Sequence, residues 1–185
     1  MVLEKLKEFP KNLYVFFLTI IGFLIFILIN ILVFTPINQI VPPPYGIIDF
    51  EFAWVPEQVL TIFASWGASG MAAEALAIYW DFFYIVGYGS FIFGAILLVI
   101  RKVEGKFQKF GLWMTLTPIL AGIFDVIENI NLLIMLDKAP TFSSFLPFIA
   151  SLTASIKFGL LFLGIAFFFV ALIMAIIKLI RRREY

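Results

Sequence analysis

The chain has 185 residues, of which 63% are hydrophobic, and its mean hydropathy is +1.10. Ordinary soluble domains are about 45–50% apolar, so we expect one integral membrane domain over residues 1–185. The net charge of +1 gives no reason to predict a nucleic-acid partner. Cysteine and histidine are both absent, which excludes disulfides, thiol catalysis, His-ligated haem and the common zinc sites. Neither a metal nor a cofactor is therefore predicted.

Four apolar segments reach the length of about 20 residues that a helix needs to cross a bilayer. They cover about 13–34, 78–100, 112–136 and 148–180, and a longer connection over 35–77 joins the first two. The sequence therefore predicts an all-α membrane protein, a bundle of four transmembrane helices whose main partner is the lipid bilayer.

Basic residues gather on one side of these spans. Of the 13 lysines and arginines, 11 precede the first span, lie between the second and third, or follow the fourth: Lys5, Lys7, Lys11, Arg101, Lys102, Lys106, Lys109, Lys178 and Arg181–Arg183. The positive-inside rule makes this side cytoplasmic. We predict a multi-pass protein of the plasma membrane with both termini inside and the segment 35–77 outside.

The outer segment carries two patterns. Between Ile48 and Phe52 apolar residues alternate with Asp49 and Glu51, which is typical of a short strand or an extended interfacial strip. The stretch after Pro56 instead has the i, i+3, i+4, i+7 spacing of an amphipathic helix, with apolar positions at Val59, Ile62, Phe63 and Trp66. We expect a short interfacial helix that anchors the loop; the alternative is a lid over an outward-opening cavity.

The third span contains AGIFDVIENINLL, which places Asp125, Glu128 and Asn129 on one helical face. Small residues share this face, and Pro118 on it is expected to kink the helix, with Thr115 or Thr117 satisfying a freed carbonyl. Small residues let helices approach and polar residues bond between them, so the face points into the bundle. Each central acid costs about 2.5–3.5 kcal/mol on insertion, so we expect this span to insert as a hairpin with the fourth.

The fourth span supplies a partner for these acids. Lys157 shares its face with small residues and, in an antiparallel hairpin, lies at about the depth of Glu128. We therefore predict an ion pair between Lys157 and Glu128 or Asp125.

Two faces of the second span also matter. Asp81, Tyr84 and Tyr88 share one face, and Glu74 extends it outward. Gly87, Ser90 and Gly94 lie on the opposite face, where another helix can pack closely.

The predicted polar cluster combines these faces with one acid from the outer loop. Its members are Asp81, Tyr84, Tyr88, Asp125, Glu128, Asn129, Lys157 and Glu51, with Asp49 and Asn30 as further candidates. Excess acid in a low dielectric suits a cation, a proton relay or an amine-bearing ligand. A purely structural role in holding helices together, and carboxylate acid–base catalysis, both stay open.

The order of GIIDFEFA, DFFYIVGY, DVIEN and KF, over about residues 46–158, resembles a group of small prokaryotic four-span proteins described as hypothetical membrane proteins. This resemblance implies the architecture and no activity.

Three functions remain as hypotheses. The first is a small membrane protein that binds or conducts a cation, a proton or an amine-bearing molecule, as a homo-oligomer if it conducts. The second is an accessory or scaffold subunit without a ligand. The third is a lipid-modifying enzyme, against which the sequence offers no histidine, no nucleophile motif and no phosphate-binding glycine loop.

Overall fold

The computed structural model describes residues 2–41 and 43–181, and every regular element within these ranges is helical. The elements are α1 (Val2–Lys5), α2 (Asn12–Ile29), the π-helical turn η1 (Asn30–Phe34), α3 (Thr35–Ile40), α4 (Ile47–Glu51), α5 (Pro56–Ile100), α6 (Gly105–Met114), α7 (Thr117–Lys138) and α8 (Leu146–Arg181). Four helical stretches are long and apolar enough to cross a membrane. The protein is therefore an all-α, multi-pass membrane protein. Arg182 and Arg183, counted above among the basic residues, lie outside the described residues.

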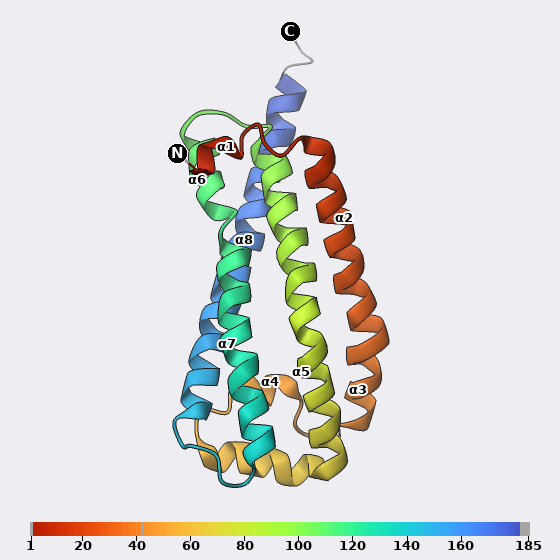
Figure 1. The fold of residues 1–185 in the computed structure, drawn as a ribbon. Coiled ribbons are helices and arrows are strands. Elements are labelled where there is room, and N and C mark those ends of the chain that lie inside the picture. Colours follow the sequence, from red (N-terminus) through yellow and green to blue (C-terminus); the bar gives the residue numbers. More distant parts are fainter. Residues whose placement is uncertain (1, 42, 182–185) are drawn as a thin grey trace.

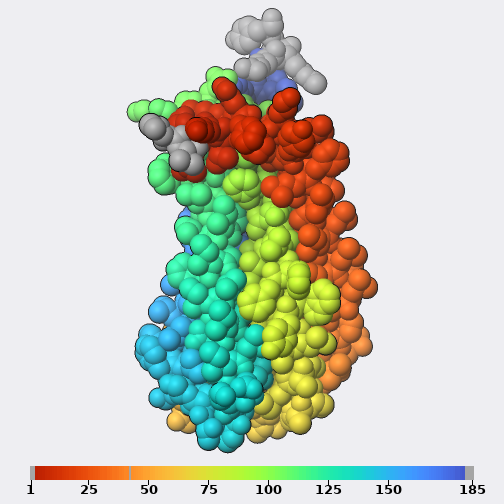
Figure 2. Space-filling view, in the orientation of Figure 1, coloured from red at the N-terminus to blue at the C-terminus, as the bar shows by residue number. Residues whose placement is uncertain are grey.

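The long helices α2, α5, α7 and α8 run lengthwise through the molecule (Figure 1). One end, called here the terminal end, carries α1, α6 and the last turns of α8, and the other, the α4 end, carries α4 and the first part of α5. Within the described residues α2 packs along α5 and not along α7 or α8, whereas α8 packs against both α7 and α5. Figure 2 shows α7, α5 and α2 side by side on one face of the molecule.

The expectation of a short strand or an extended strip from Ile48 to Phe52 is wrong in both forms, because this stretch belongs to the one-turn helix α4 and the residue after it. The Asp49 carboxylate accepts a hydrogen bond of 2.8 Å from the Gly46 backbone N–H and so caps the helix. A strand here would have no neighbouring strand to satisfy its backbone, whereas a helix bonds internally. The turn also buries Phe50 and Glu51 side by side.

Helix α5 begins at Pro56, well before the predicted start of the second span near residue 78. It has two arms that meet at Gly67, whose φ of +62° lies in the left-handed region that favours glycine. The first arm crosses the α4 end of the bundle, and the second runs its length (Figure 1). The apolar positions predicted to form a helical stripe are all buried: Val59, Ile62, Phe63 and Trp66. Their stripe packs against Phe50 and the other long helices, so it contacts protein.

The third predicted span consists of two helices, because α6 ends at Met114 and α7 begins at Thr117. Pro118 has no N–H to offer the Met114 carbonyl one turn earlier. The Thr117 hydroxyl donates to that carbonyl at 2.9 Å instead, and the Thr115 hydroxyl donates to Leu112 O at 2.7 Å. The predicted compensation by threonine is therefore confirmed, and next to this proline the single predicted span is divided into two helices.

Glycines bring α2 and α5 into close contact. A Cβ placed on Gly22 would lie 2.7 Å from the Gly87 carbonyl oxygen, and one on Gly94 would lie 2.1 Å from Thr19 Oγ1. The small face predicted at Gly87, Ser90 and Gly94 is therefore the surface on which α2 packs.

We expect Gly22→Ala to destabilise the protein by about 1–3 kcal/mol, because the added methyl group meets backbone that cannot move aside. Thermal unfolding in detergent measures the loss. Gly159→Ala is the matched control, since a Cβ there meets nothing within 4 Å. Equal melting temperatures for the two variants would contradict the close α2–α5 contact.

Candidate functional site

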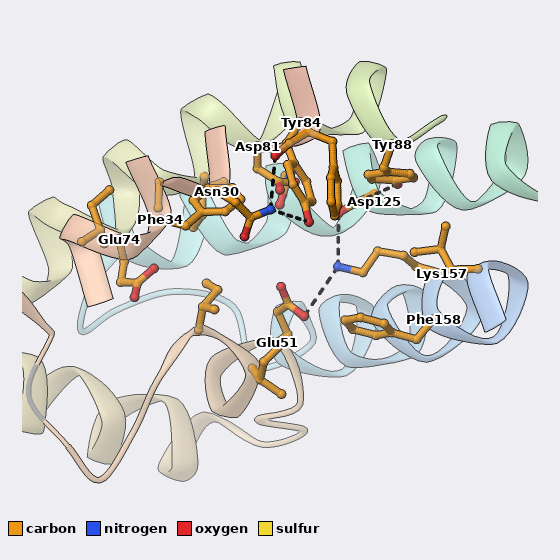
Figure 3. A pocket seen from close by; sticks show the side chains of 18 of the residues that line it. Asn30, Phe34, Glu51, Glu74, Asp81, Tyr84, Tyr88, Asp125, Lys157 and Phe158 are labelled. Atoms are coloured by element: carbon orange, nitrogen blue, oxygen red, sulfur yellow. Dashed lines mark hydrogen bonds and ion pairs between the residues drawn. The ribbon is translucent and has the colours of Figure 1, made fainter. Parts of the chain in front are cut away.

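A cavity of about 360 Å³ lies between α2 and α8, with α5 and α7 as its floor. The turn η1 and helices α3 and α4 complete its wall. Polar side chains from α4, α5, α7 and α8 point into the space between the helices (Figure 3). The cavity therefore collects residues that lie far apart in the sequence.

Lys157 of α8 is the centre of the charged contacts. Its Nζ lies 2.9 Å from Glu128 Oε2, 3.2 Å from Asp125 Oδ1 and 3.5 Å from Glu51 Oε2. All four side chains are buried. The predicted ion pair is confirmed with both acids of α7, and Glu51 of α4 joins it. One ammonium group thus links three helices.

The polar face of α5 forms hydrogen bonds with the polar face of α7. Tyr88 OH donates to Asp125 Oδ2 at 2.8 Å, so Asp125 lies between a phenol and the lysine. Asn129 Nδ2 donates to Asp81 Oδ2 at 2.7 Å. The tyrosine and aspartate predicted on α5 therefore meet the acid and amide predicted on α7.

Asn30 connects α2 to this network, because its Nδ2 donates to Tyr84 OH at 3.1 Å. It opens the π-helical turn, in which the Thr35 backbone N–H bonds to Asn30 O. Pro36 follows and cannot donate to the carbonyl four residues earlier. Wide turns of this kind occur often at functional sites, and here the turn borders the cavity.

Small side chains let α7 and α8 carry these charges at close range. Ala121 on α7 and Ala150 and Ala154 on α8 are fully buried. Because they leave little bulk between the helices, the lysine and the two acids of α7 meet directly. The small-residue stripe predicted beside Lys157 is the surface that packs against α7.

Glu51 and Glu74 are the two acids of the cavity with the weakest contacts, since Glu51 makes the longest ion pair with Lys157, at 3.5 Å, and one oxygen of Glu74 has no hydrogen-bond partner in the described part of the chain. Burial raises the pKa of the Glu51 carboxyl above its ordinary value, and this effect outweighs the attraction of Lys157. Glu74 is buried to 1% exposure, lines the cavity, and its Oε1 has no hydrogen-bond partner within the described residues. The sequence placed Glu74 only at the outward margin of the polar face.

The structure separates Asp49 from this group. Its side chain is exposed and bonds to Gly46, so the suggestion that it enters the site from the loop is wrong. Every other residue of the predicted cluster lines the cavity or contacts a residue that does.

Acid exceeds base in and around the cavity. One lysine faces five carboxyl groups, which belong to Glu51, Glu74, Asp81, Asp125 and Glu128. Within the described residues no three of them are grouped so that they hold a metal ion. The spread of the acids along the cavity suits a ligand with several hydrogen-bond donors, or protons on some of the acids.

We expect Lys157→Met to destabilise the protein by about 3–5 kcal/mol, because it leaves buried carboxylates without their cation. The double variant Lys157→Met, Glu128→Gln should regain part of this loss in detergent melting experiments. Lys178→Met, which breaks an ion pair with the exposed Glu104 side chain, should cost at most about 1 kcal/mol. A Lys157→Met protein as stable as wild type would contradict the structural role of the lysine.

The raised pKa of Glu51 leads us to expect that the stability of the protein depends on pH. Because its pKa is raised in the folded protein, folding retains a proton that the unfolded chain releases above its ordinary value of 4.5. The free energy of unfolding therefore falls as the pH rises above 4.5 toward the raised pKa of the folded state, and Glu51→Gln removes this contribution. We expect the melting temperature of Glu51→Gln to fall less than that of wild type over this range. Glu57→Gln, an exposed carboxylate on α5, is the control; parallel curves for wild type and Glu51→Gln would contradict the prediction.

No family model, no curated protein and no solved structure matches this chain. The resemblance to four-span prokaryotic proteins therefore stays a prediction.

Proposed function

We propose that this protein binds an amine-bearing cation in the cavity between α2 and α8. The observation that carries the proposal is the excess of carboxyl groups over Lys157, together with the buried Glu74 oxygen that has no partner. A buried acceptor without a donor costs about 1–3 kcal/mol, and more when charged, so a ligand that donates to it binds with a corresponding gain.

An ammonium group fits the cavity in three respects. It offers several N–H donors, which suits acids that are spread along a wall. Its charge balances carboxylates that Lys157 leaves uncompensated. Aromatic rings of Phe34, Tyr84 and Phe158 border the same space, and such rings attract cations. Phe158 already lies under the lysine, with Nζ 4.6 Å from its ring centre.

The basic residues support an orientation for the site. The first basic cluster, the α5–α6 connection and the end of α8 lie at the terminal end of the bundle (Figure 1). By the positive-inside rule we place this end in the cytoplasm and the α4 end outside, in the plasma membrane. The cavity then belongs to the outer half of the bundle, and the first arm of α5 lies across the outer membrane surface.

Binding is favoured over conduction by the packing beyond the cavity. Toward the terminal end, Ile96, Leu97, Ile100 and Leu112 are fully buried against one another. These four packed side chains, called here the apolar plug, close the cavity on that side. Conduction by a single chain would require the plug to separate, so transport is proposed only for a homo-oligomer or a rearranged state.

One rival function has an observation of its own. The three ion pairs of Lys157 suit a scaffold subunit whose polar cluster serves only stability. That function does not explain why Glu74 is buried without a partner, since a purely structural cluster gains by replacing it.

A short amine tests the proposal. We expect n-butylamine, at constant pH and ionic strength, to raise the melting temperature of the purified protein, and n-butanol at the same concentration to have no such effect. Glu74→Gln should weaken the apparent affinity for n-butylamine by about tenfold or more, since a hydrogen bond to a charged group contributes about 1.5–3 kcal/mol. Glu57→Gln, which removes an exposed carboxylate from the same helix, should bind like wild type. Equal stabilisation by the alcohol and the amine would exclude an ammonium site.

A further inference from the structure

We infer that the ligand is a lipid-like amine that enters sideways from the bilayer through the seam between α2 and α8. Its amine group would lie among Glu51, Glu74 and Asp81, and its alkyl chain would run along the cavity toward Ile92 and Ile165. This inference rests on the proposed amine site and adds the rest of the ligand and its route of entry.

The seam is a gap in the helix packing. Helix α2 is held by α5, and α8 by α7 and α5, while α2 does not pack along α8 within the described residues. Two of the residues that line the cavity from α8 are correspondingly open, Phe158 at 38% and Ile165 at 42% exposure. On the opposite wall Phe26 and Phe34 are only half-buried. These residues belong to helices that cross the membrane, so the surroundings they face are lipid.

The α4 end offers less access. There the helix α4 contributes Ile47, Ile48 and Glu51 to the cavity wall, and Glu51 contacts Lys157 on α8. The Phe52 ring stacks on Phe158 with centroids 5.8 Å apart. The first arm of α5 crosses the same end of the bundle (Figure 1). A molecule that arrives between α2 and α8 does not have to displace the first arm of α5 (Figure 1).

The acids of the cavity are accompanied by apolar residues such as Ile47, Ile48 and Ile78, whereas the part of the lining toward the terminal end is apolar alone. Glu74 and Asp81 lie toward the α4 end of α5, and Ile92 lies eleven residues beyond Asp81, a distance of about 16 Å along a helix. Leu161 and Ile165 of α8 continue the apolar part. The acids thus occupy the outer and middle parts of the space and an apolar part follows, as an amphiphile with an amine group requires.

The direction of this gradient agrees with that of a membrane lipid. With the α4 end at the outer surface, the acidic end of the cavity lies nearest the headgroups and the apolar end lies nearest the bilayer centre. A lipid of that leaflet can therefore enter without turning over. Transfer of the ligand's alkyl chain from lipid into the cavity changes its free energy little, because both surroundings are apolar. Selectivity therefore comes from the amine group.

Trp substitutions at the seam are tested in phosphatidylcholine nanodiscs with tetradecylamine and n-butylamine as the two probes. Thermal stabilisation measures affinity and so whether the alkyl chain occupies the seam, and the rate of binding measures the route. We expect Ile165→Trp to raise the half-saturating concentration of tetradecylamine about tenfold and to leave that of n-butylamine unchanged. Ile165 is exposed at the rim, so the larger side chain can be accommodated; Leu161→Trp is a second variant on the same wall. Phe162→Trp, at a position 76% exposed on α8 and outside the cavity lining, should behave like wild type with both probes. Tetradecanol should not stabilise any of these proteins.

Other outcomes separate this inference from the proposed function. If n-butylamine binds and the Trp variants bind tetradecylamine as tightly and as fast as wild type does, the lateral route is wrong and the amine site stands. If tetradecanol stabilises as well as tetradecylamine, the cavity takes any alkyl chain and the selectivity inferred for the amine is overturned. If neither amine stabilises the protein, the amine site itself is excluded, and the inference fails with it.

Discussion

The ammonium group of Lys157 and the carboxylates around it determine how the bundle can be arranged. In a low dielectric both the attraction between these charges and the cost of leaving one unpaired are large, so their helices must stay together. Two of the acids come from α7, the neighbour of α8 in sequence, and the third comes from α4. The same contact that joins the hairpin therefore also holds the short helix α4 over the end of the cavity.

The lipid surroundings explain why α2 packs closely on α5 and not along α8. Helices in a bilayer gain little from hiding apolar surface from lipid, and they associate where backbones can approach. Gly22 and Gly87 provide that approach between α2 and α5. Facing α2, helix α8 presents the large side chains of Phe158, Leu161 and Ile165. Helix α2 therefore lies close to α5, while the large side chains of α8 keep α8 away from α2, and the cavity between α2 and α8 stays open to the side.

Much of the polar cluster could be predicted because it follows from helical spacing. Asp125, Glu128 and Asn129 share a face in any helix, and a short hairpin fixes the depth of Lys157 relative to them. The sequence did not predict the burial of Glu74, which depends on a helix that begins far earlier than its apolar run and bends at Gly67.

Contacts that depend on other elements were harder to predict. The alternation around Glu51 suits a strand as well as a helix when no partner is known, and only the fold of α4 decides between them. The seam was beyond prediction for a related reason. In the part of the chain that the structure describes, α2 and α8 do not pack along each other, and the periodicity of a single helix does not indicate which of its neighbours it will leave uncovered.

The π-helical turn at Asn30–Phe34 has a consequence for the phase of the helix that contains it. Steps of four residues in an α-helix drift by about 40° each, so a row of side chains spaced in this way gradually winds around the axis. The wider turn takes back part of that drift. Phe26, Asn30, Phe34 and Asn38 can therefore all line one cavity, although they span more than three turns. Loss or gain of a single residue within this turn would rotate everything after it by about 100° and turn Ile37, now in the core, toward another side.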